Sequence, residues 1–520
     1  MTSTLILGGK VYAPGIPDAQ ALIVESGRIA WIGDRQTAKS VASGETRIVD
    51  FEDAFISPGF VDAHVHLSAT GALKLGHSLN EVSSWSQLAD LVNGEVAAKD
   101  AKFLFMFGWD DSDWPDSREI FQNQLSAHAL ATPMYLARVD GHSAIANLPQ
   151  FELHLTFVSG IQRQEVWEFF TQELDADFTS RAIVSALKEA ARNGIVSVHE
   201  NGGRNVSSES DFRTVISLQD DPNLPNIIPY WADSSLELAK NLGALGVAGD
   251  YNVDGSLGSR TAWLAEPYSD ASETCGLQYL SAQQIAEHLI EATNQQVQAG
   301  FHAIGDAACE EVHQGFLLAL ESISPAQVRS CRHRIEHLTL PSSEAIALFA
   351  ELGVVASVQP SFDARWGRSG GMYEQRLGAQ RLSESHPFRN MIKAGMILAF
   401  GSDSPVTTSS PWDWIRAATT HNQATQRISS RAAFTAATRG GHRAANDDES
   451  GVLAIGMRAD LAVWQVDRYE SQEEHEKISS WSTDPRSGTH SLPDLSVGNP
   501  SCLATIRSGK FIFDETALSA

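Results

Sequence analysis

The sequence predicts an α/β protein with a (β/α)8 barrel, a small β domain built from its two ends, and an inserted subdomain. Apolar, strand-like runs alternate with amphipathic helical segments through the middle of the chain. Short strands and glycine turns occupy both ends. Residues 67–193, between the first two barrel strands, are too many for one crossover and contain further strand and turn material, which indicates the insertion.

Eight apolar runs supply the barrel strands, and most are joined by amphipathic segments such as residues 180–194 and 281–300. The second segment has Ser281 at its expected N-cap and a glycine just past its end. A doubly wound open sheet is the alternative, but no GxGxxG sequence follows the first strand. The expected strands are residues 60–66, 194–200, 226–232, 249–255, 300–306, 332–337, 353–360 and 396–403.

Domain boundaries follow from the change in texture along the chain. Residues 1–57 and 451–520 are predicted to form the composite β domain, and residues 58–450 the barrel. Residues 80–180 are predicted to form the inserted subdomain over the barrel mouth. The fold class is therefore a barrel interrupted once after its first strand.

Composition narrows the classes of partner. A net charge of −26 disfavours nucleic acid and anionic membranes as partners. The expected partner is a small-molecule substrate, about which the net charge says little, and a homodimer is left open. No apolar run approaches the length of a membrane span, and the N-terminus lacks the pattern of a signal peptide. Four scattered cysteines without CxxC spacing favour a reducing cytoplasm over a disulfide framework.

Two histidines close the first barrel strand in the sequence PGFVDAHVHL, residues 58–67. Alternate residues of a strand point to the same face, so His64 and His66 leave the backbone in one direction and their ring nitrogens can meet at one ion. Two hydrogen-bonded histidines at a strand end would give the same pattern. A metal site therefore requires further ligands from elsewhere in the chain.

Further ionisable residues fall at or near the ends of other predicted strands. His302 lies in the fifth strand, His337 ends the sixth and Asp403 ends the eighth, while Asp250 begins the fourth. The carboxyl ends of barrel strands meet at one rim, so these side chains and the two histidines of the first strand predict a divalent metal site. Zinc is the default metal for hydrolysis, with manganese and iron as alternatives. Asp403 beside a metal-activated water can take its proton.

Several motifs resemble the amidohydrolase superfamily: PGFVDAHVHL, HAIGDAA, RIEH, GSDSPV and the closing GMRADLAV. GWDDSDW, RVDGHSAIAN and DGSLGSRTA narrow the resemblance to amidohydrolase family 3, the branch that includes N-substituted formamide deformylase. The resemblance extends from the N-terminal strands to about residue 464. It implies a metal-dependent hydrolase with a distorted barrel and a urease-type β-sandwich from the two termini.

The resemblance also implies roles for particular residues. Carried onto this sequence, the four strand-end histidines match metal ligands, and Asp403 matches a ligand that is also the general base. Asp140, His142, Trp109 and Arg260 fall in the motifs of the insertion and of the DGSLGS loop. For these four, contact with substrate and support of the insertion and the loop are equal alternatives.

One position departs from the family pattern. Many members carry a lysine four residues before the DG of DGSLGS, and its carbamate can bridge two metals; here that position is Asp250. No lysine occurs between Lys240 and Lys393, so strands four to seven offer no substitute. The sequence therefore predicts one metal, or two metals bridged by Asp250 in a contracted geometry.

The predicted function is hydrolysis of a non-peptide C–N bond, amide or formamide-like, in a small molecule. Hydrolysis of an ester, a lactone or a cyclic amidine on the same apparatus is the alternative among enzymes, because the barrel does not choose the substrate. A metal-binding relative without turnover is the alternative from another class, and Asp250 is the one feature that favours it.

Overall fold

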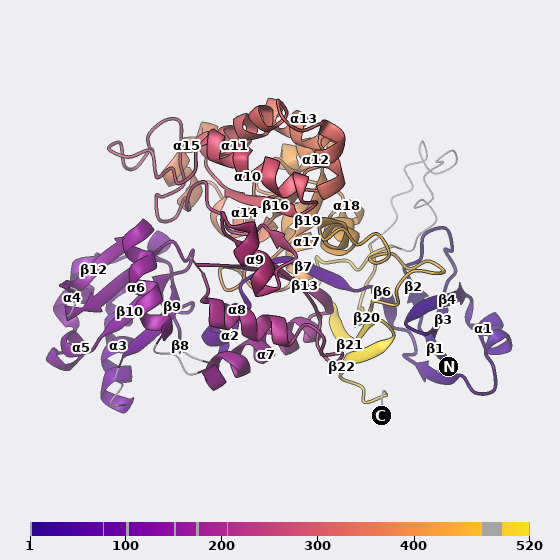
Figure 1. Ribbon diagram of the computed structural model, residues 1–520. Coiled ribbons are helices and arrows are strands. Elements are labelled where there is room, and N and C mark those ends of the chain that lie inside the picture. Colours follow the sequence, from indigo (N-terminus) through magenta and orange to yellow (C-terminus); the bar gives the residue numbers. More distant parts are fainter. Residues whose placement is uncertain are drawn as a thin grey trace.

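The computed structural model contains a barrel of eight parallel strands between two smaller β regions (Figure 1). It describes residues 3–75, 77–99, 103–149, 152–172, 176–204, 206–470 and 491–518. The predicted fold class is confirmed. In chain order, the barrel strands are β7 (Phe60–Val65), β13 (Ile195–Gly203), β14 (Asn226–Ala232), β15 (Gly246–Val247), β16 (Gln298–Ala303), β17 (Arg334–His337), β18 (Val355–Val358) and β19 (Ile397–Phe400).

The sheet nearly closes where its first strand, β7, meets its last, β19. Beyond the end of β19, Asp403 N donates to His64 O at 2.8 Å, and His66 N donates to Ser404 O at 3.0 Å. Gly401 permits this approach, because a Cβ atom there would lie 2.6 Å from His64 N. The closing hydrogen bonds thus bring the segment that carries Asp403 against the strand that carries the two histidines.

The fourth barrel strand differs from its prediction. β15 covers only Gly246–Val247, and residues 249–255 follow it as irregular chain, in which Asn252 makes one bridge to His302. Gly249 has a φ of +90°, so the chain turns out of the strand there. Asp250 therefore follows the strand instead of beginning it, which places it at the rim of the barrel, as its predicted ligand role requires.

Helices surround the barrel, and an apolar core of strand and helix side chains fills the space between them. The predicted helix at 281–300 begins at its N-cap Ser281 with a capping box, but it ends at Asn294, and Gly300 lies inside β16. The barrel helices are α2 (Leu67–Leu75), α7 (Ala176–Arg192), α8 (Glu209–Ser217), α9 (Leu236–Leu242), α10 (Ala282–Asn294), α11 (Asp306–Ala319), α12 (Pro325–Cys331), α13 (Ser343–Glu351), α14 (Pro360–Trp366), α15 (Met372–Glu384), α16 (Phe388–Ala394), α17 (Pro411–Thr420), α18 (Ser430–Thr435) and α19 (Gly441–Ala444).

The inserted subdomain is a five-stranded sheet with helices, at the left of Figure 1. Its sheet has the order β12-β11-β10-β9-β8, with β8 (His77–Ser78), β9 (Leu104–Trp109), β10 (Met134–Arg138), β11 (Ser143–Leu148) and β12 (Leu153–Ser159). Its helices are α3 (Trp85–Lys99), α4 (Arg118–Gln124), α5 (Ala127–Ala131) and α6 (Gly160–Gln172). It has its own apolar core around Trp85 and Trp109.

The two ends of the chain build a pair of sheets on the other side of the barrel (Figure 1). One apolar core joins them, with Leu22 and Ile56 from the N-terminal part and Leu461 and Ile506 from the C-terminal part. No helix among the described residues is long and apolar enough to cross a membrane. The first sheet contains β1 (Ser3–Leu7), β3 (Ala21–Glu25), β4 (Arg28–Gly33) and β5 (Arg47–Asp50), and the second β2 (Lys10–Val11), β6 (Phe55–Pro58), β20 (Leu461–Gln465), β21 (Ser501–Arg507) and β22 (Lys510–Asp514). Helix α1 (Arg35–Val41) packs against β3 and β4 of the first sheet.

Candidate metal centre

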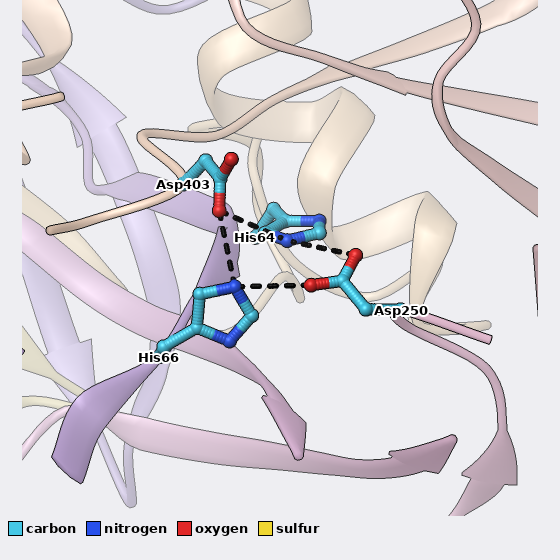
Figure 2. A group of neighbouring side chains, drawn as sticks. All are labelled: His64, His66, Asp250 and Asp403. Carbon is cyan, nitrogen blue, oxygen red and sulfur yellow. Dashed lines mark ion pairs between the residues drawn. The ribbon is translucent and has the colours of Figure 1, made fainter. Parts of the chain in front are cut away.

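Two histidines and two aspartates gather at the carboxyl end of the barrel (Figure 2). His66 Nε2 lies 3.0 Å from Asp403 Oδ1 and 3.1 Å from Asp250 Oδ2. His64 Nε2 lies 3.3 Å from Asp403 Oδ1 and 3.5 Å from Asp250 Oδ1. All four side chains are buried, so four potential ligand atoms converge at a place with little water.

A second group of potential ligands shares one residue with the first. Asp250, His302 and His337 offer ligand atoms within 4.8 Å of one another, and Asp250 Oδ1 lies 3.7 Å from His337 Nε2. The predicted ligands thus come together, and Asp250 stands between the histidines of β7 and those of β16 and β17.

The backbone is unusual at two ligand positions. His337 has a φ of +68° and Asp403 a φ of +53°, a left-handed conformation that non-glycine residues rarely adopt. Both lie at or just beyond a strand end, where the chain must turn to aim a side chain across the rim. Such strain is found at functional sites, where the surrounding structure holds it in place.

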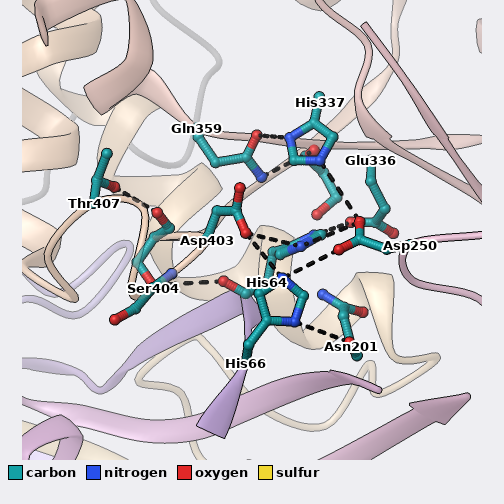
Figure 3. A network of polar contacts seen from close by, with 12 residues as sticks. His64, His66, Asn201, Asp250, Glu336, His337, Gln359, Asp403, Ser404 and Thr407 are labelled. Atoms are coloured by element: carbon teal, nitrogen blue, oxygen red, sulfur yellow. Dashed lines mark hydrogen bonds and ion pairs between the residues drawn. The ribbon is translucent and has the colours of Figure 1, made fainter. Parts of the chain in front are cut away.

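Hydrogen bonds from their other ring nitrogens fix the three histidines that end strands β7 and β17 (Figure 3). His64 Nδ1 donates to Glu336 Oε2 at 2.8 Å, His66 Nδ1 to the Asn201 carbonyl at 3.0 Å, and His337 Nδ1 to Gln359 Oε1 at 2.7 Å. The acceptors carry no proton, so each Nδ1 is protonated, and each Nε2 would offer its lone pair to a metal that displaces any proton it carries. That lone pair faces the cluster, which is the arrangement of metal-binding histidines.

Behind His64, a buried ion pair holds the acceptor in position. Arg334 donates to both carboxylate oxygens of Glu336, and both side chains are fully buried. Although burial opposes its ionisation, the charge of Arg334 lowers the pKa of Glu336 to about 2. Glu336 is therefore an ionised acceptor for His64 at neutral pH. Sequence reasoning missed this role, although the residue stands beside His337 in RIEH.

On the opposite side of the rim, Asp254 organises the loop that follows His302. Asp254 Oδ1 accepts from Ile304 N at 3.0 Å, and Asp254 Oδ2 accepts from Gly305 N at 2.8 Å and from Trp263 N at 2.9 Å. His302 Nδ1 lies 3.4 Å from Asp254 Oδ1. Asp254 therefore fixes the backbone that follows His302 and places a carboxylate beside its ring.

The charges in the cluster stabilise one another. Burial opposes the charged form of His66, but hydrogen bonds and charges from Asp250 and Asp403 raise its pKa to about 10. Burial likewise opposes ionisation of the two aspartates, yet the charge of His64 lowers the pKa of both. Both carboxylates are thus ionised at neutral pH, as ligands must be.

The donor set fits a divalent cation. His64 Nε2 and Asp250 Oδ1 are buried, and within the described part of the chain neither has a hydrogen-bond partner. Buried polar atoms without partners are uncommon in proteins, and an ion at this place would satisfy both. Imidazole nitrogens and carboxylate oxygens are ligands that zinc, manganese and iron share.

A cavity of about 260 Å³ opens beside the cluster. His66, Asp250 and Asp403 form one wall, and Asp140 and His142 of the inserted subdomain form another. Asp140 is engaged by Arg138 and by the hydroxyls of Ser256 and Ser259, so it anchors the turn that carries His142.

Two predicted substrate contacts lie elsewhere. Trp109 does not line this cavity: its ring is buried in the core of the inserted subdomain, and Trp109 Nε1 donates to the Leu136 carbonyl at 2.8 Å. Arg260 does not line it either, and pairs with Asp270 at 2.8 Å. These positions match the alternative that Trp109 and Arg260 support the insertion and the loop.

Comparison with known proteins gives the family. The amidohydrolase family 3 model matches residues 47–513. This chain belongs to the amidohydrolase family. The family match and the histidine–aspartate cluster together make it a metal-dependent hydrolase.

Two relatives of this amidohydrolase cover most of its length. Protein LONG AFTER FAR-RED 3 of Arabidopsis thaliana is 27% identical over 522 residues, which cover 90% of this chain and 88% of that protein. N-substituted formamide deformylase of Arthrobacter pascens is 22% identical over 442 residues, which cover 76% of this chain and 78% of that protein.

Solved structures share the fold of this amidohydrolase. A metal-dependent hydrolase of uncharacterised function from Pyrococcus furiosus superposes with a TM-score of 0.69 at 24% identity, over 89% of this chain and 98% of that chain. Its counterpart from Pyrococcus horikoshii OT3 gives 0.70 at 23% identity, over 90% and 98%. At these identities, the likeness concerns the fold alone.

Proposed function

We propose that this amidohydrolase cleaves a non-peptide C–N bond, amide or formamide-like, in a small molecule. The observation that carries the proposal is Asp403, an ionised carboxylate that lines the cavity and touches the two-histidine cluster. A carboxylate in this place can serve both proton transfers that hydrolysis of an amide requires. The likeness to an N-substituted formamide deformylase supports the same type of bond.

Asp403 acts first as a base and then as an acid in this proposal. A divalent ion, when bound, supplies a Lewis acid for the carbonyl and brings the pKa of a coordinated water to about 7. Asp403 accepts the proton of the attacking water and returns it to the leaving nitrogen, which departs as a neutral amine.

His142 is placed to bind the carbonyl oxygen of the substrate. It lines the same cavity, and its ring centroid lies 5.3 Å from that of His302. Burial, helped by the charge of His302, lowers the pKa of His142 to about 3, against the opposing charge of Asp140. A neutral imidazole can donate one hydrogen bond to an oxygen on which negative charge develops.

We infer that the metal is zinc and that Asp250 would contribute its carboxylate to both groups of ligands. Its Oδ2 faces His66, whereas its Oδ1 faces His64 and His337, so one carboxylate serves both groups of ligands. Elemental analysis should find two tightly bound ions in the wild type and at most one in Asp250→Ala. Asp233→Ala, with its carboxylate beside Arg204, is the matched control. Two ions in Asp250→Ala would exclude the shared role.

A screen of N-formyl and N-acyl amines, with and without chelator, tests the function. Turnover that disappears with chelator and returns with zinc is the expected result. Turnover of esters, lactones or cyclic amidines, without turnover of any amide, would show that the enzyme carries out the alternative hydrolysis and not the proposed one. No turnover with any class, in protein shown to hold metal, would support the non-catalytic relative. A cytoplasmic location and a homodimer stay predictions.

A further inference from the structure

The inserted subdomain contributes one cation to the cavity wall. Arg163, on helix α6, is the only lysine or arginine among the described residues that line the cavity beside the metal centre. Arg163 Nη1 donates to the Gly141 carbonyl at 2.7 Å. Gly141 lies between Asp140 and His142, so Arg163 is held against the turn that carries the proposed carbonyl-binding residue.

Neighbouring groups show where the charge of Arg163 is felt. Burial raises the pKa of the Tyr135 hydroxyl and of the Tyr279 hydroxyl, and in each case the charge of Arg163 works against the rise. The same charge helps burial to lower the pKa of His142. Tyr135, Tyr279 and His142 all line the cavity. The guanidinium charge therefore acts on groups inside the cavity.

The charge of Arg163 stands out because the chain is so acidic. With a net charge of −26, the protein repels anions from most of its surface. Arg138, another cation of the insertion, is buried, pairs with Asp110 and Asp140, and does not line the cavity. Asp140 in turn is engaged by Arg138, Ser256 and Ser259. A ligand anion in the cavity would meet a cation at Arg163.

Several aromatic side chains also line the cavity. Phe107, Tyr135 and Trp167 line it from the inserted subdomain, and Tyr251 lines it from the irregular chain after β15. Aromatic side chains bury large apolar areas and stack on rings. A ligand that fits this cavity thus has a polar carbonyl at the metal end, an apolar or aromatic body, and an anionic group within reach of Arg163.

We propose that Arg163 binds a carboxylate of the substrate, so that the substrate class is an amide that carries a carboxylate and an apolar, preferably aromatic, body. This inference rests on the proposed C–N hydrolysis for its reacting group, but not for its binding step. A guanidinium presents a planar fork of N–H donors that matches a carboxylate with two parallel hydrogen bonds. Arg163 is a specificity residue in this proposal and takes no part in bond cleavage.

Binding to the metal-loaded protein provides a test that does not depend on turnover. The probes are 3-phenylpropanoate and its neutral analogue 3-phenylpropanamide, and the readout is the Kd from calorimetry. Hydrogen bonds to charged groups predict that the wild type prefers the anion at least about tenfold. Arg163→Gln should reduce the preference to below about twofold, and Arg163→Lys should keep part of it. Arg181→Gln, on the exposed face of α7, should leave the preference unchanged.

A carboxylate that binds the metal instead of Arg163 would give a preference that survives in Arg163→Gln, and this result would overturn the inference. A wild type that prefers the neutral probe would overturn it as well. If Arg163→Gln does not fold, since it loses the bond to Gly141, the wild-type preference and the Arg163→Lys variant decide.

Kinetics with N-formylphenylalanine and N-formyl-2-phenylethylamine then separate the two proposals. A lower KM for the anionic amide, lost in Arg163→Gln while kcat holds, supports the inference. Anion-selective binding without hydrolysis of either compound would support the role of Arg163 and count against the proposed function. Hydrolysis of both compounds with equal KM would support the proposed function and count against the role of Arg163.

Discussion

The cavity has two parts that are built in different ways. The metal end is formed by the candidate ligands, and the far wall is formed by Phe107, Tyr135, Trp167 and Arg163. At the metal end, the candidate ligands come from strands or from the first residues after them, and buried hydrogen bonds to Glu336, Asn201 and Gln359 hold the rings. The far wall comes largely from the insertion, where Phe107 and Arg163 are only partly buried. The register of the barrel sets the metal end, whereas the packing of a separate subdomain sets the far wall. The reaction and its selectivity can therefore change independently.

The largest expected effect is at the metal end. Asp403→Asn keeps the shape of the side chain but removes the base, so kcat should fall by about 10² to 10⁴ in saturating zinc, with KM for a turned-over amide little changed. Steady-state kinetics check this, with Asp413→Asn, at the Asp413–Arg416 ion pair of α17, as control. A variant that folds, holds metal and keeps its kcat would remove Asp403 from the reaction.

A smaller effect is expected one layer behind the ligands. Glu336→Gln removes the charge that accepts from His64 and faces Arg334, so zinc affinity should fall by about 10- to 100-fold. Competition with a chelator measures the affinity, and Glu344→Gln, in the first turn of α13, is the control. Unchanged zinc affinity in a folded variant would show that the orientation of His64 does not depend on this acceptor.

At the far wall, a change should affect binding and leave the chemistry alone. Phe107→Ala removes part of the aromatic lining, so KM for an aromatic amide should rise by about fivefold while kcat stays constant. Phe157→Ala, exposed on β12 of the same subdomain, is the control. A drop in kcat equal to that of Asp403→Asn would contradict the division between the two ends.

The smallest effect is expected at the opposite end of β17, far from the chemistry. His333 is fully buried just before the strand, and burial lowers its pKa to about 3. In the unfolded chain the histidine has a pKa of about 6.5, so it binds a proton below that pH, whereas the native state does not. The free energy of unfolding therefore falls as the pH drops through about 6.5. From pH 7.5 to 5.5, this residue should cost about 1.4 kcal/mol of the free energy of unfolding.

Urea unfolding of the wild type and of His333→Gln at the two pH values measures this difference. The variant is less stable at both, because Thr293 Oγ1 loses a partner, but its loss between pH 7.5 and 5.5 should be about 1.4 kcal/mol smaller. An equal loss in both proteins would show that His333 is not the group that responds to pH.

More of the metal end than of the far wall could be predicted from the sequence, and the reason is physical. His64 and His66 are fixed by strand alternation, and His337 and Asp403 by their place at strand ends, so local pattern and barrel topology suffice. Asp250, in contrast, falls at the start of the strand that the sequence predicts over residues 249–255. The strand is in fact two residues long and ends before Gly249.

The far wall depends on packing that no local pattern records. Arg163 lies in a helix without a recognisable motif, and it reaches the cavity because the insertion supplies part of the cavity wall. Trp109 stands in a conspicuous motif, yet it packs into the insertion's own core. A motif can thus mark a residue that supports a subdomain, whereas a residue of the cavity can carry no sequence signal.

The hydrogen bonds that join Asp403 to His64 and His66 to Ser404 have a consequence for biosynthesis. The two histidines leave the ribosome early, whereas the segment that closes the ring and carries the last candidate ligand follows hundreds of residues later. Closure of the sheet and assembly of the ligand cluster are therefore one event. The nascent chain therefore has no complete metal site until the barrel closes, and metal binds to the folded barrel.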